Sequence, residues 1–255
     1  MSAPDGAAAL PLAGRICLVV GGSGGIGSAT AERLAALGGT VIVTYAAREA
    51  AAQALVARLP GSGHSAEPAQ VEDSATLVAL AARVRERHGV LHILVNAAGF
   101  TRPVPHADLD ALDDALIDRM FAVNWRGSFA AVRAFAPLLK ESGDGLVVNI
   151  SSIAGSTGTG SSIAYCAAKA GIDVMTKSLA RALAPAVRVM GVSPGVVDTD
   201  FVPGRDAAFN AKVAASIPLK RIASAGDVAE AVVACATSLR YSTGSLLVVD
   251  GGRAL

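Results

Sequence analysis

The chain has 255 residues, a formal net charge of +1, and a composition of 52% hydrophobic and 17% charged residues. This near-neutral charge argues against nucleic acid and membranes as partners, because nucleic acid and anionic lipid are bound through strongly basic surfaces. The longest uncharged stretch, 145–168, contains Asn149 and many Ser, Thr and Gly residues, which a membrane span does not tolerate well. An α/β chain of this length commonly forms one domain, so we treat 1–255 as a single domain.

The cysteines and the N-terminus suggest where the protein resides. Cys17, Cys166 and Cys235 are scattered, without a CxxC pair or the spacing of metal ligands. We therefore expect reduced thiols, no bound metal and a cytoplasmic location. Residues 1–11 include Asp5 and lack the basic start of a secretory signal, so we interpret them as an N-terminal extension.

Short apolar runs alternate with helical patterns along the chain. The first run, Ile16–Val20, does not alternate with polar residues, which is typical of a strand buried on both faces. We expect strands at 16–20, 40–45, 64–69 (the weakest), 91–98, 146–151, 187–194 and 245–252, with helices including 28–37, 47–59 and 74–88 between them. This alternation predicts an α/β fold: a single-domain Rossmann fold whose doubly wound parallel sheet is flanked by helices on both faces.

A glycine-rich turn, VGGSGGIG, follows the first strand and precedes a helix. Glycine permits a positive φ and lets main-chain N–H groups approach a pyrophosphate at the helix N-terminus. The turn therefore predicts a dinucleotide site that includes Gly21, Ser23, Gly25, Ile26 and Gly27.

The second strand suggests which dinucleotide is bound. An acidic residue about 20 positions past the glycines usually binds the adenosine 2′-hydroxyl, but Tyr45 stands there and Arg48 follows. Because a guanidinium attracts a 2′-phosphate and no carboxylate repels it, the sequence favours NADP(H), with NAD(H) as the alternative. Arg48 could equally be a solvated helix residue.

Tyr165 and Lys169 are four residues apart, so on a helix they share one face. Lys169 is the only charged residue between Gly145 and Ile172, and an ammonium in such apolar surroundings requires a reason. A cation about 4 Å from a phenol would lower its pKa by roughly 3 units, which acid–base chemistry near neutrality needs. The pair therefore predicts that Tyr165 is a catalytic acid with a lowered pKa.

Four features occur in an order that resembles the short-chain dehydrogenase/reductase family. They are the strand with its glycine turn, the NAAG sequence at 96–99, the S-S…Y-x-x-x-K pattern and a later Pro-Gly. The resemblance runs from about residue 12 to 252. It implies that Ser152, thirteen residues before Tyr165, donates to the substrate oxygen, with Ser151 as the competing choice. It also implies that Tyr165 transfers the proton, that Lys169 binds the nicotinamide ribose, and that Asn124 holds a water linked to Lys169.

The resemblance implies further cofactor contacts along the later strands. These are Gln70 and Val71 near the adenine, and Asn96, Ala97, Gly99, Pro194, Gly195, Val197 and Thr199 along the cofactor floor. The family pattern has a second asparagine where Ala97 stands and an acid where Gln70 stands.

Residues 200–219 correspond to a mobile substrate lid in the family, with Phe201, Val202 and Phe209 as candidate apolar contacts. The lid contains few charges, so an uncharged carbonyl compound fits it better than a polyanion, which would call for clustered arginines. Thr-Arg after the NAAG resembles 3-oxoacyl-carrier-protein reductases. Arg102, Arg119 and Arg126 are candidate contacts with an acyl-carrier protein, and helices near 121–139 and 164–183 are candidate contacts of a homotetramer or homodimer.

The sequence thus predicts an NADP(H)-dependent oxidoreductase that reduces a ketone or 3-oxoacyl carbonyl to an alcohol. One alternative is an NAD(P)-dependent alcohol or polyol dehydrogenase working oxidatively. Another is a catalytically silent nucleotide-sensing regulator, but such a protein would have no need to keep both Tyr165 and Lys169.

Overall fold

The computed structural model describes residues 9–255, so most of the expected extension 1–11 lies outside the described residues. One parallel sheet runs in the order β3-β2-β1-β4-β5-β6-β7. Its strands are β1 (Ile16–Val20), β2 (Thr40–Tyr45), β3 (Ser65–Pro68), β4 (Ile93–Asn96), β5 (Gly145–Ile150), β6 (Val187–Pro194) and β7 (Leu246–Val249). The chain order reverses between β1 and β4, and such a switch point opens a crevice at the carboxyl ends of the strands.

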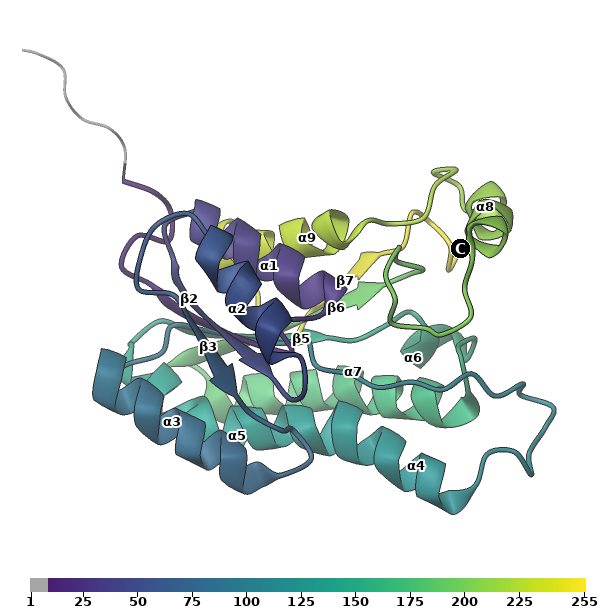
Figure 1. Cartoon of the computed structure of the whole chain (residues 1–255), viewed down its shortest axis with the longest axis horizontal. Coiled ribbons are helices and arrows are strands. Elements are labelled where there is room, and N and C mark those ends of the chain that lie inside the picture. Colours follow the sequence, from purple (N-terminus) through teal and green to yellow (C-terminus); the bar gives the residue numbers. More distant parts are fainter. Residues whose placement is uncertain (1–8) are drawn as a thin grey trace, which may run out of the picture.

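Helices cover both faces of this sheet, as the sequence predicted (Figure 1). They are α1 (Gly25–Ala36), α2 (Glu49–Arg58), α3 (Ser74–His88), α4 (Asp114–Phe121), the π-helical segment η1 (Ala122–Arg126), α5 (Gly127–Glu141), α6 (Ala154–Thr157), α7 (Ile163–Leu183), α8 (Ala207–Ser216) and α9 (Ala225–Thr237). Helices α1, α2 and α9 lie on one face, and α3, α5 and α7 on the other (Figure 1). Within residues 9–255, no helix is long and apolar enough to span a bilayer.

Several predicted boundaries differ from the observed ones. Helix α1 begins at Gly25, three residues earlier than expected, because the glycine turn itself forms its first turn. Strand β4 covers 93–96 rather than 91–98, since the chain after Asn96 leaves the sheet at the crevice.

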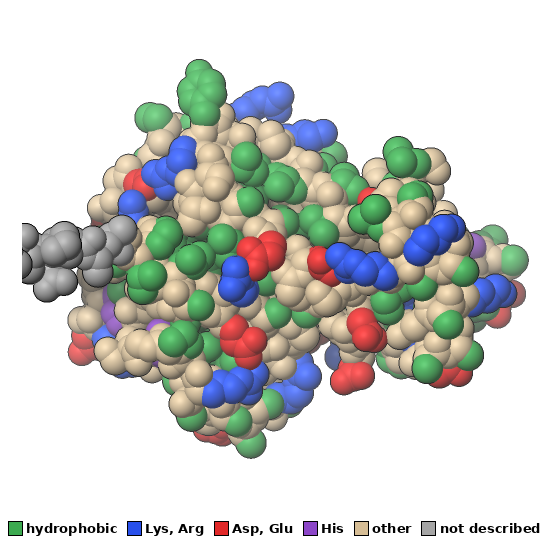
Figure 2. All heavy atoms as spheres, turned by 90° about the horizontal axis from the view of Figure 1, so that it is seen from above, with side chains coloured by type: hydrophobic (Ala, Val, Ile, Leu, Met, Phe, Trp, Pro, Cys, Tyr) green, Lys and Arg blue, Asp and Glu red, His purple; other side chains and the backbone are tan. Residues whose placement is uncertain are grey.

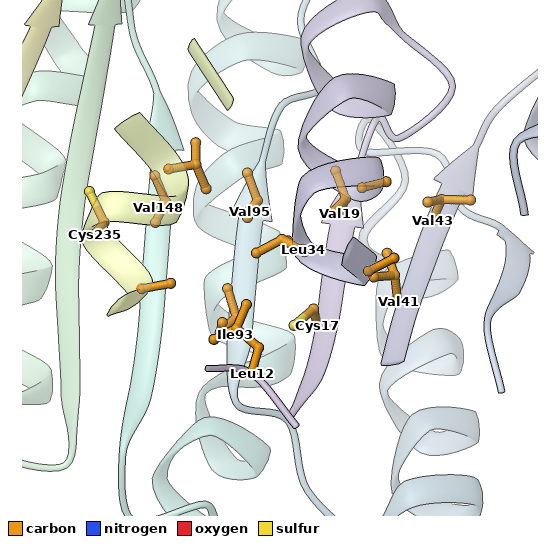
Figure 3. Packing of buried hydrophobic residues seen from close by; sticks show 14 of the residues in the cluster. Leu12, Cys17, Val19, Leu34, Val41, Val43, Ile93, Val95, Val148 and Cys235 are labelled. Carbon is orange, nitrogen blue, oxygen red and sulfur yellow. The ribbon is translucent and has the colours of Figure 1, made fainter. Parts of the chain in front are cut away.

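Strand β1 shows how the sheet builds two cores. Cys17 and Val19 point to the α1 and α9 face, where they pack with Leu34 (Figure 3). Leu18 and Val20 point to the opposite core, under α3 and α5. Because alternate residues of a strand face opposite sides, an uninterrupted apolar strand is what a sheet covered on both faces requires.

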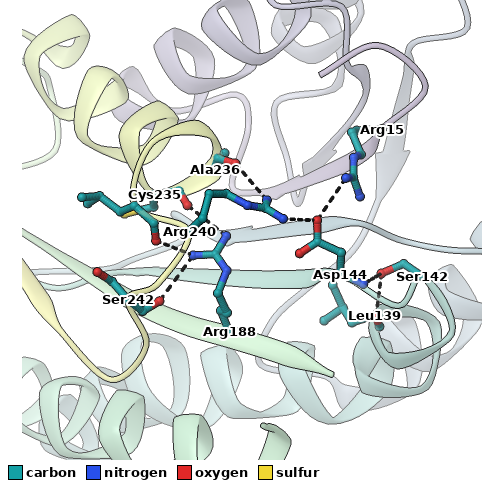
Figure 4. Close-up of polar contacts among 10 residues, drawn as sticks. Arg15, Leu139, Ser142, Asp144, Arg188, Cys235, Ala236, Arg240 and Ser242 are labelled. Atoms are coloured by element: carbon teal, nitrogen blue, oxygen red, sulfur yellow. Dashed lines mark hydrogen bonds and ion pairs between the residues drawn. The ribbon is translucent and has the colours of Figure 1, made fainter. Parts of the chain in front are cut away.

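A polar cluster joins segments at the amino ends of the strands (Figure 4). Asp144, just before β5, accepts hydrogen bonds from Arg15 at 3.0 Å and from Arg240. Arg188 of β6 donates to the main-chain carbonyls of Cys235, in the last turn of α9, and of Leu239, just after it. Burial alone would raise the pKa of Asp144, but the hydrogen bond from Arg240 and the nearby arginine charges hold it below its ordinary value. The cluster fixes β1, β5 and the end of α9 far from the crevice.

We expect Asp144→Asn to lower the free energy of unfolding by about 1–2 kcal/mol at pH 7, since its side chain is only 29% exposed and meets two guanidinium groups. A lowered folded pKa means that the carboxylate contributes stability above its unfolded pKa of 3.8 and loses it as pH falls through the folded value. Urea denaturation tests this. The control is Glu32→Gln, which removes an exposed ion pair with Arg58 and should lower the free energy of unfolding less. Equal losses in the two variants would contradict a stabilising role of the Asp144 cluster.

Candidate active site

A cleft of about 610 Å³ opens at the carboxyl ends of the strands. Residues that follow β1, β2, β3, β4, β5 and β6 line it, together with residues of α1, α7 and the segment around α8. Most of the predicted cofactor residues are in this lining, namely Gly21, Ser23, Gly25, Ile26, Gly27, Tyr45, Arg48, Gln70, Val71, Ala97, Gly99, Pro194, Gly195, Val197 and Thr199. The predicted catalytic residues Ser152, Tyr165 and Lys169 line it as well.

Two predicted site residues lie behind the cleft wall. Asn96 is 3% exposed, and its amide donates to Asn149 Oδ1 at 2.9 Å, joining β4 to β5. Asn124 is fully buried in η1, donates to the carbonyls of Phe100 and Met120, and accepts from the Phe100 N–H. The side chain of Asn96 therefore supports the floor of the cleft, and that of Asn124 holds the chain after the NAAG sequence in place.

Close approach explains three of the five glycines of the turn, which are Gly21, Gly25 and Gly27. Gly21 has φ +79°, and a Cβ there would lie 2.6 Å from the main chain of Ala98. A Cβ on Gly27 would lie 2.2 Å from the carbonyl oxygen of Gly21, and one on Gly25 would lie 2.5 Å from Thr199 Cγ2. Helix α1 begins without a side-chain cap and without an acidic residue in its first turn. Its free N–H groups and positive end fit the pyrophosphate of a dinucleotide.

The end of β2 forms one end of the cleft. Arg48 is exposed and caps the start of α2, rather than lying within the helix as the sequence suggested. Its guanidinium reaches back over the glycine turn, where Nη2 lies 3.6 Å from the position a Cβ on Gly24 would take. The pKa of the Tyr45 hydroxyl is raised by partial desolvation and by a hydrogen bond with Glu49.

Ser152 and Tyr165 meet in the substrate part of the cleft. Ser162 caps α7 by accepting from the main-chain N–H of Tyr165 at 3.2 Å, and this places Tyr165 in the first turn. Ser152 Oγ accepts from the Ala154 N–H at 3.2 Å, and the nearby Ser152 hydroxyl lowers the pKa of the Tyr165 phenol against the larger effect of burial. Ser151 is buried and its hydroxyl donates to the Lys169 carbonyl at 3.2 Å, so it holds β5 against α7. The geometry therefore favours Ser152 over Ser151 as the substrate contact.

Lys169 lies one helical turn below Tyr165. It is 4% exposed, and its Nζ donates to the Ile150 carbonyl at 2.8 Å and lies 5.7 Å from the centre of the Tyr165 ring. The sequence suggested an unpaired ammonium, but the buried Asp173 on the next turn opposes the effect of burial on Lys169. Lys169 therefore has a partial countercharge within its own helix.

The pKa values differ from the expectation for this pair. Burial raises the pKa of Tyr165 to about 12, with the Ser152 hydrogen bond and the Arg205 charge acting in the opposite direction. Burial lowers the pKa of Lys169 to about 8. Desolvation is the largest cause of both shifts, and the Lys169 ammonium is directed at the Ile150 carbonyl rather than at the phenol oxygen.

The expected lid forms part of the cleft wall. Phe201, Val202 and Phe209 all line it, and the Phe201 ring lies 6.1 Å from that of Tyr165. Asp206 caps α8 by accepting from Phe209 N at 2.7 Å. Predicted apolar contacts and the reactive tyrosine thus share one part of the cleft.

Sequence reasoning missed other residues of the lining, among them Ser161 and Arg253, and it named Arg119 only as a candidate contact with an acyl-carrier protein. Arg119 stacks over Phe100 at 4.2 Å and pairs with Glu72 at 3.8 Å. Arg253 comes from the last residues of the chain. No local pattern distinguishes these side chains from solvated ones, because only the folded chain brings them to the cleft.

Comparison with known proteins gives consistent matches over nearly the whole chain. A family model described as enoyl-(acyl carrier protein) reductase matches residues 21–254. A protein named as ketoacyl reductase 2 of the granaticin polyketide synthase, from Streptomyces violaceoruber, is 40% identical over 93% of this chain and 95% of its own. The 3-oxoacyl-(acyl-carrier-protein) reductase FabG of Escherichia coli is 35% identical over 94% of this chain and 97% of its own.

The solved structure of a short-chain type dehydrogenase/reductase from Mycobacterium ulcerans superposes with a TM-score of 0.88 at 28% identity. It covers 95% of this chain and 90% of its own. Fold, cleft and relatives agree, and the chain belongs to the short-chain dehydrogenase/reductase family of oxidoreductases.

Proposed function

We propose that the protein reduces a ketone or 3-oxoacyl carbonyl to an alcohol with NADP(H), using Tyr165 as the general acid. The convergence of Ser152, Tyr165 and Lys169 on the cleft that begins at the glycine turn carries this proposal. The similarity to proteins named as ketoacyl reductases supports the substrate class. When bound, the reduced nicotinamide supplies the hydride.

The chain's own residues supply the rest of the chemistry. The Ser152 hydroxyl would donate to the substrate oxygen and orient it beside Tyr165, a role supported by the position of both residues in the cleft lining. A phenol whose pKa is raised to about 12 keeps its proton at neutral pH, which is the state needed to protonate that oxygen during reduction. Lys169 and the main chain around the glycine turn would hold the nicotinamide ribose and the pyrophosphate.

The runner-up is oxidation of an alcohol by the same residues, in which Tyr165 accepts the proton. A panel of ketones, 3-oxoacyl thioesters and alcohols, followed by nicotinamide absorbance with both cofactors, separates the two. Reduction of a ketone or thioester faster than oxidation of its alcohol at neutral pH supports the proposal. Turnover confined to alcohols with NAD⁺ would replace it.

We expect NADPH to bind more tightly than NADH, and Arg48→Ala to narrow the gap by about 1–3 kcal/mol, the loss of a charge-assisted hydrogen bond to the 2′-phosphate. Fluorescence titration of both cofactors measures this. Arg58→Ala, on the same helix but paired with Glu32 outside the cleft, is the matched control and should leave the gap unchanged. Equal affinities in the wild type would shift the assignment to NAD(H).

We also propose a homotetramer or homodimer that uses α4, α5 and α7. Phe121 at the end of α4 is 37% exposed and Val174 on α7 is 63% exposed, which supports a contact between copies along these helices. An acyl-carrier protein stays a possible partner. Arg102 and Arg119 already pair with Asp113 and Glu72 within the chain, and acidic and basic side chains are interspersed on the face seen in Figure 2.

A further inference from the structure

Two arginines that lie far apart in the sequence line the same cleft, on either side of α8. Arg205 comes from the lid just before α8, and Arg253 comes from the chain after β7. Both side chains line the cleft and both are half-buried. The Arg205 guanidinium lies 5.1 Å from the centre of the Phe209 ring, and Arg253 Nη1 donates to Ser216 Oγ at 3.3 Å.

Within residues 9–255, neither arginine has a carboxylate partner among the ion pairs. The cleft lining contains one acidic residue, Glu72, and that side chain is paired with Arg119 at 3.8 Å. Burial lowers the pKa of Arg205, the Tyr165 hydroxyl acts in the opposite direction, and the Arg253 charge adds to the lowering. Two like charges therefore line one cleft, at the two ends of α8, without a carboxylate partner among the ion pairs of the described residues.

Partly buried cations of this kind are stabilised when an anion completes the site. The position of that anion is restricted, because Arg205 lies 5.1 Å from the centre of the Phe209 ring and Phe201 of the same segment lies 6.1 Å from the Tyr165 ring. Arg48 lies at the other end of the cleft, beside Gly24. The missing anion thus belongs with the reacting carbonyl rather than with the adenosine.

We propose that Arg205 and Arg253 bind a carboxylate of the substrate, so that the enzyme acts on keto acids whose carbonyl and carboxylate share a short, largely apolar carbon frame. This proposal rests on the proposed reduction and narrows its substrate class. Phe201, Val202 and Phe209 provide an apolar wall in the same cleft, with Phe201 beside Tyr165 and Phe209 beside Arg205. A carboxylate fits better than the phosphate of a carrier-protein arm, since that phosphate is many bonds from the thioester carbonyl.

This inference changes the expectation drawn from the sequence. The lid segment holds Arg205 without a second arginine nearby in sequence, which favoured an uncharged substrate. Folding brings Arg253 to the same cleft, so the clustered arginines that an anionic substrate requires are present.

The test compares a cyclic keto acid with its methyl ester, which keeps the carbon frame and the ketone but replaces the negative charge with a methyl group. We expect the wild type to prefer the acid in kcat/KM by about 10-fold or more. Arg205→Met and Arg253→Met should each lower kcat/KM for the acid by about 10- to 100-fold and leave the ester nearly unchanged. Lys212→Met, an exposed cation on α8 outside the lining, is the control and should change neither.

A binding measurement separates this proposal from the proposed reduction. Titration calorimetry with a saturated cyclic carboxylate, which lacks the carbonyl, should detect binding to the wild-type complex with NADPH and a loss of at least 10-fold in both arginine variants. If no ketone is reduced but this binding depends on the arginines, the reduction fails and the carboxylate site stands. Equal kcat/KM for acid and ester, or variants that weaken NADPH binding while the carboxylate still binds, would overturn the carboxylate site.

Discussion

Tyr165→Phe should lower turnover by at least about 100-fold while the dissociation constant of NADPH stays close to the wild-type value. The substitution removes only the hydroxyl, which is the proton donor, and keeps the ring that packs 6.1 Å from Phe201. Steady-state reduction of the best ketone measures the first quantity, and fluorescence titration measures the second.

Ser152→Ala is the companion variant for this prediction. It should also slow reduction without a loss of cofactor affinity, because the proposed role of Ser152 is to orient the substrate oxygen beside the phenol. Ser151→Ala provides the matched contrast, since that hydroxyl is committed to the Lys169 carbonyl. Wild-type turnover in Tyr165→Phe would show that another group delivers the proton.

Lys169→Met should have the second largest effect, with loss of both turnover and cofactor affinity. It removes the cation beneath Tyr165 and the proposed ribose contact. Without cofactor, the free energy of unfolding of this variant should depend on pH differently from that of the wild type. The reason is that the wild type buries the Lys169 ammonium, and burial lowers its pKa from 10.5 to about 8. The charged form therefore opposes folding at neutral pH.

The sign of the pH dependence follows from that lowered pKa. Between pH 8 and 10.5 the unfolded chain binds more protons at Lys169 than the folded chain does, so wild-type stability rises with pH relative to Lys169→Met. Between pH 7 and pH 9.5, the free energy of unfolding of the wild type should rise by about 2 kcal/mol relative to that of Lys169→Met, since one pKa unit corresponds to about 1.36 kcal/mol. Urea denaturation at pH 7 and 9.5 measures it. Lys177→Met, an exposed lysine on the same helix, should show no such slope, and a flat difference for Lys169→Met would contradict a buried ammonium.

Local patterns predicted much of the fold because they report burial directly. The apolar strand Ile16–Val20 and helix Ser74–His88 match their predicted bounds, since one is covered on both faces and the other begins at the Asp73 cap. The glycine turn and the Tyr165–Lys169 spacing likewise predicted residues that line the cleft. These signals are short-range, so they do not depend on the rest of the chain.

Long-range geometry accounts for what the sequence did not show. Asn96 belongs to a conspicuous motif, yet its side chain is turned toward Asn149. Asp173 looked like an ordinary helix residue, but the packing of α7 against β5 buries it near Lys169. Arg253 reaches the cleft only because β7 ends beside β6 at the edge of the sheet. Each depends on contacts between distant segments, which no local pattern encodes.

Deuterium transfer tests the central claim most directly. NADPH labelled with deuterium at the reactive carbon of the nicotinamide, incubated with a ketone or keto acid that the enzyme reduces, should yield an alcohol with deuterium on the former carbonyl carbon. Mass spectrometry should detect the label with the wild type, and at least about 100-fold more slowly with Tyr165→Phe. Tight NADPH binding with no label transferred to any carbonyl compound of the panel, or equal transfer by both proteins, would contradict a carbonyl reduction in which Tyr165 supplies the proton.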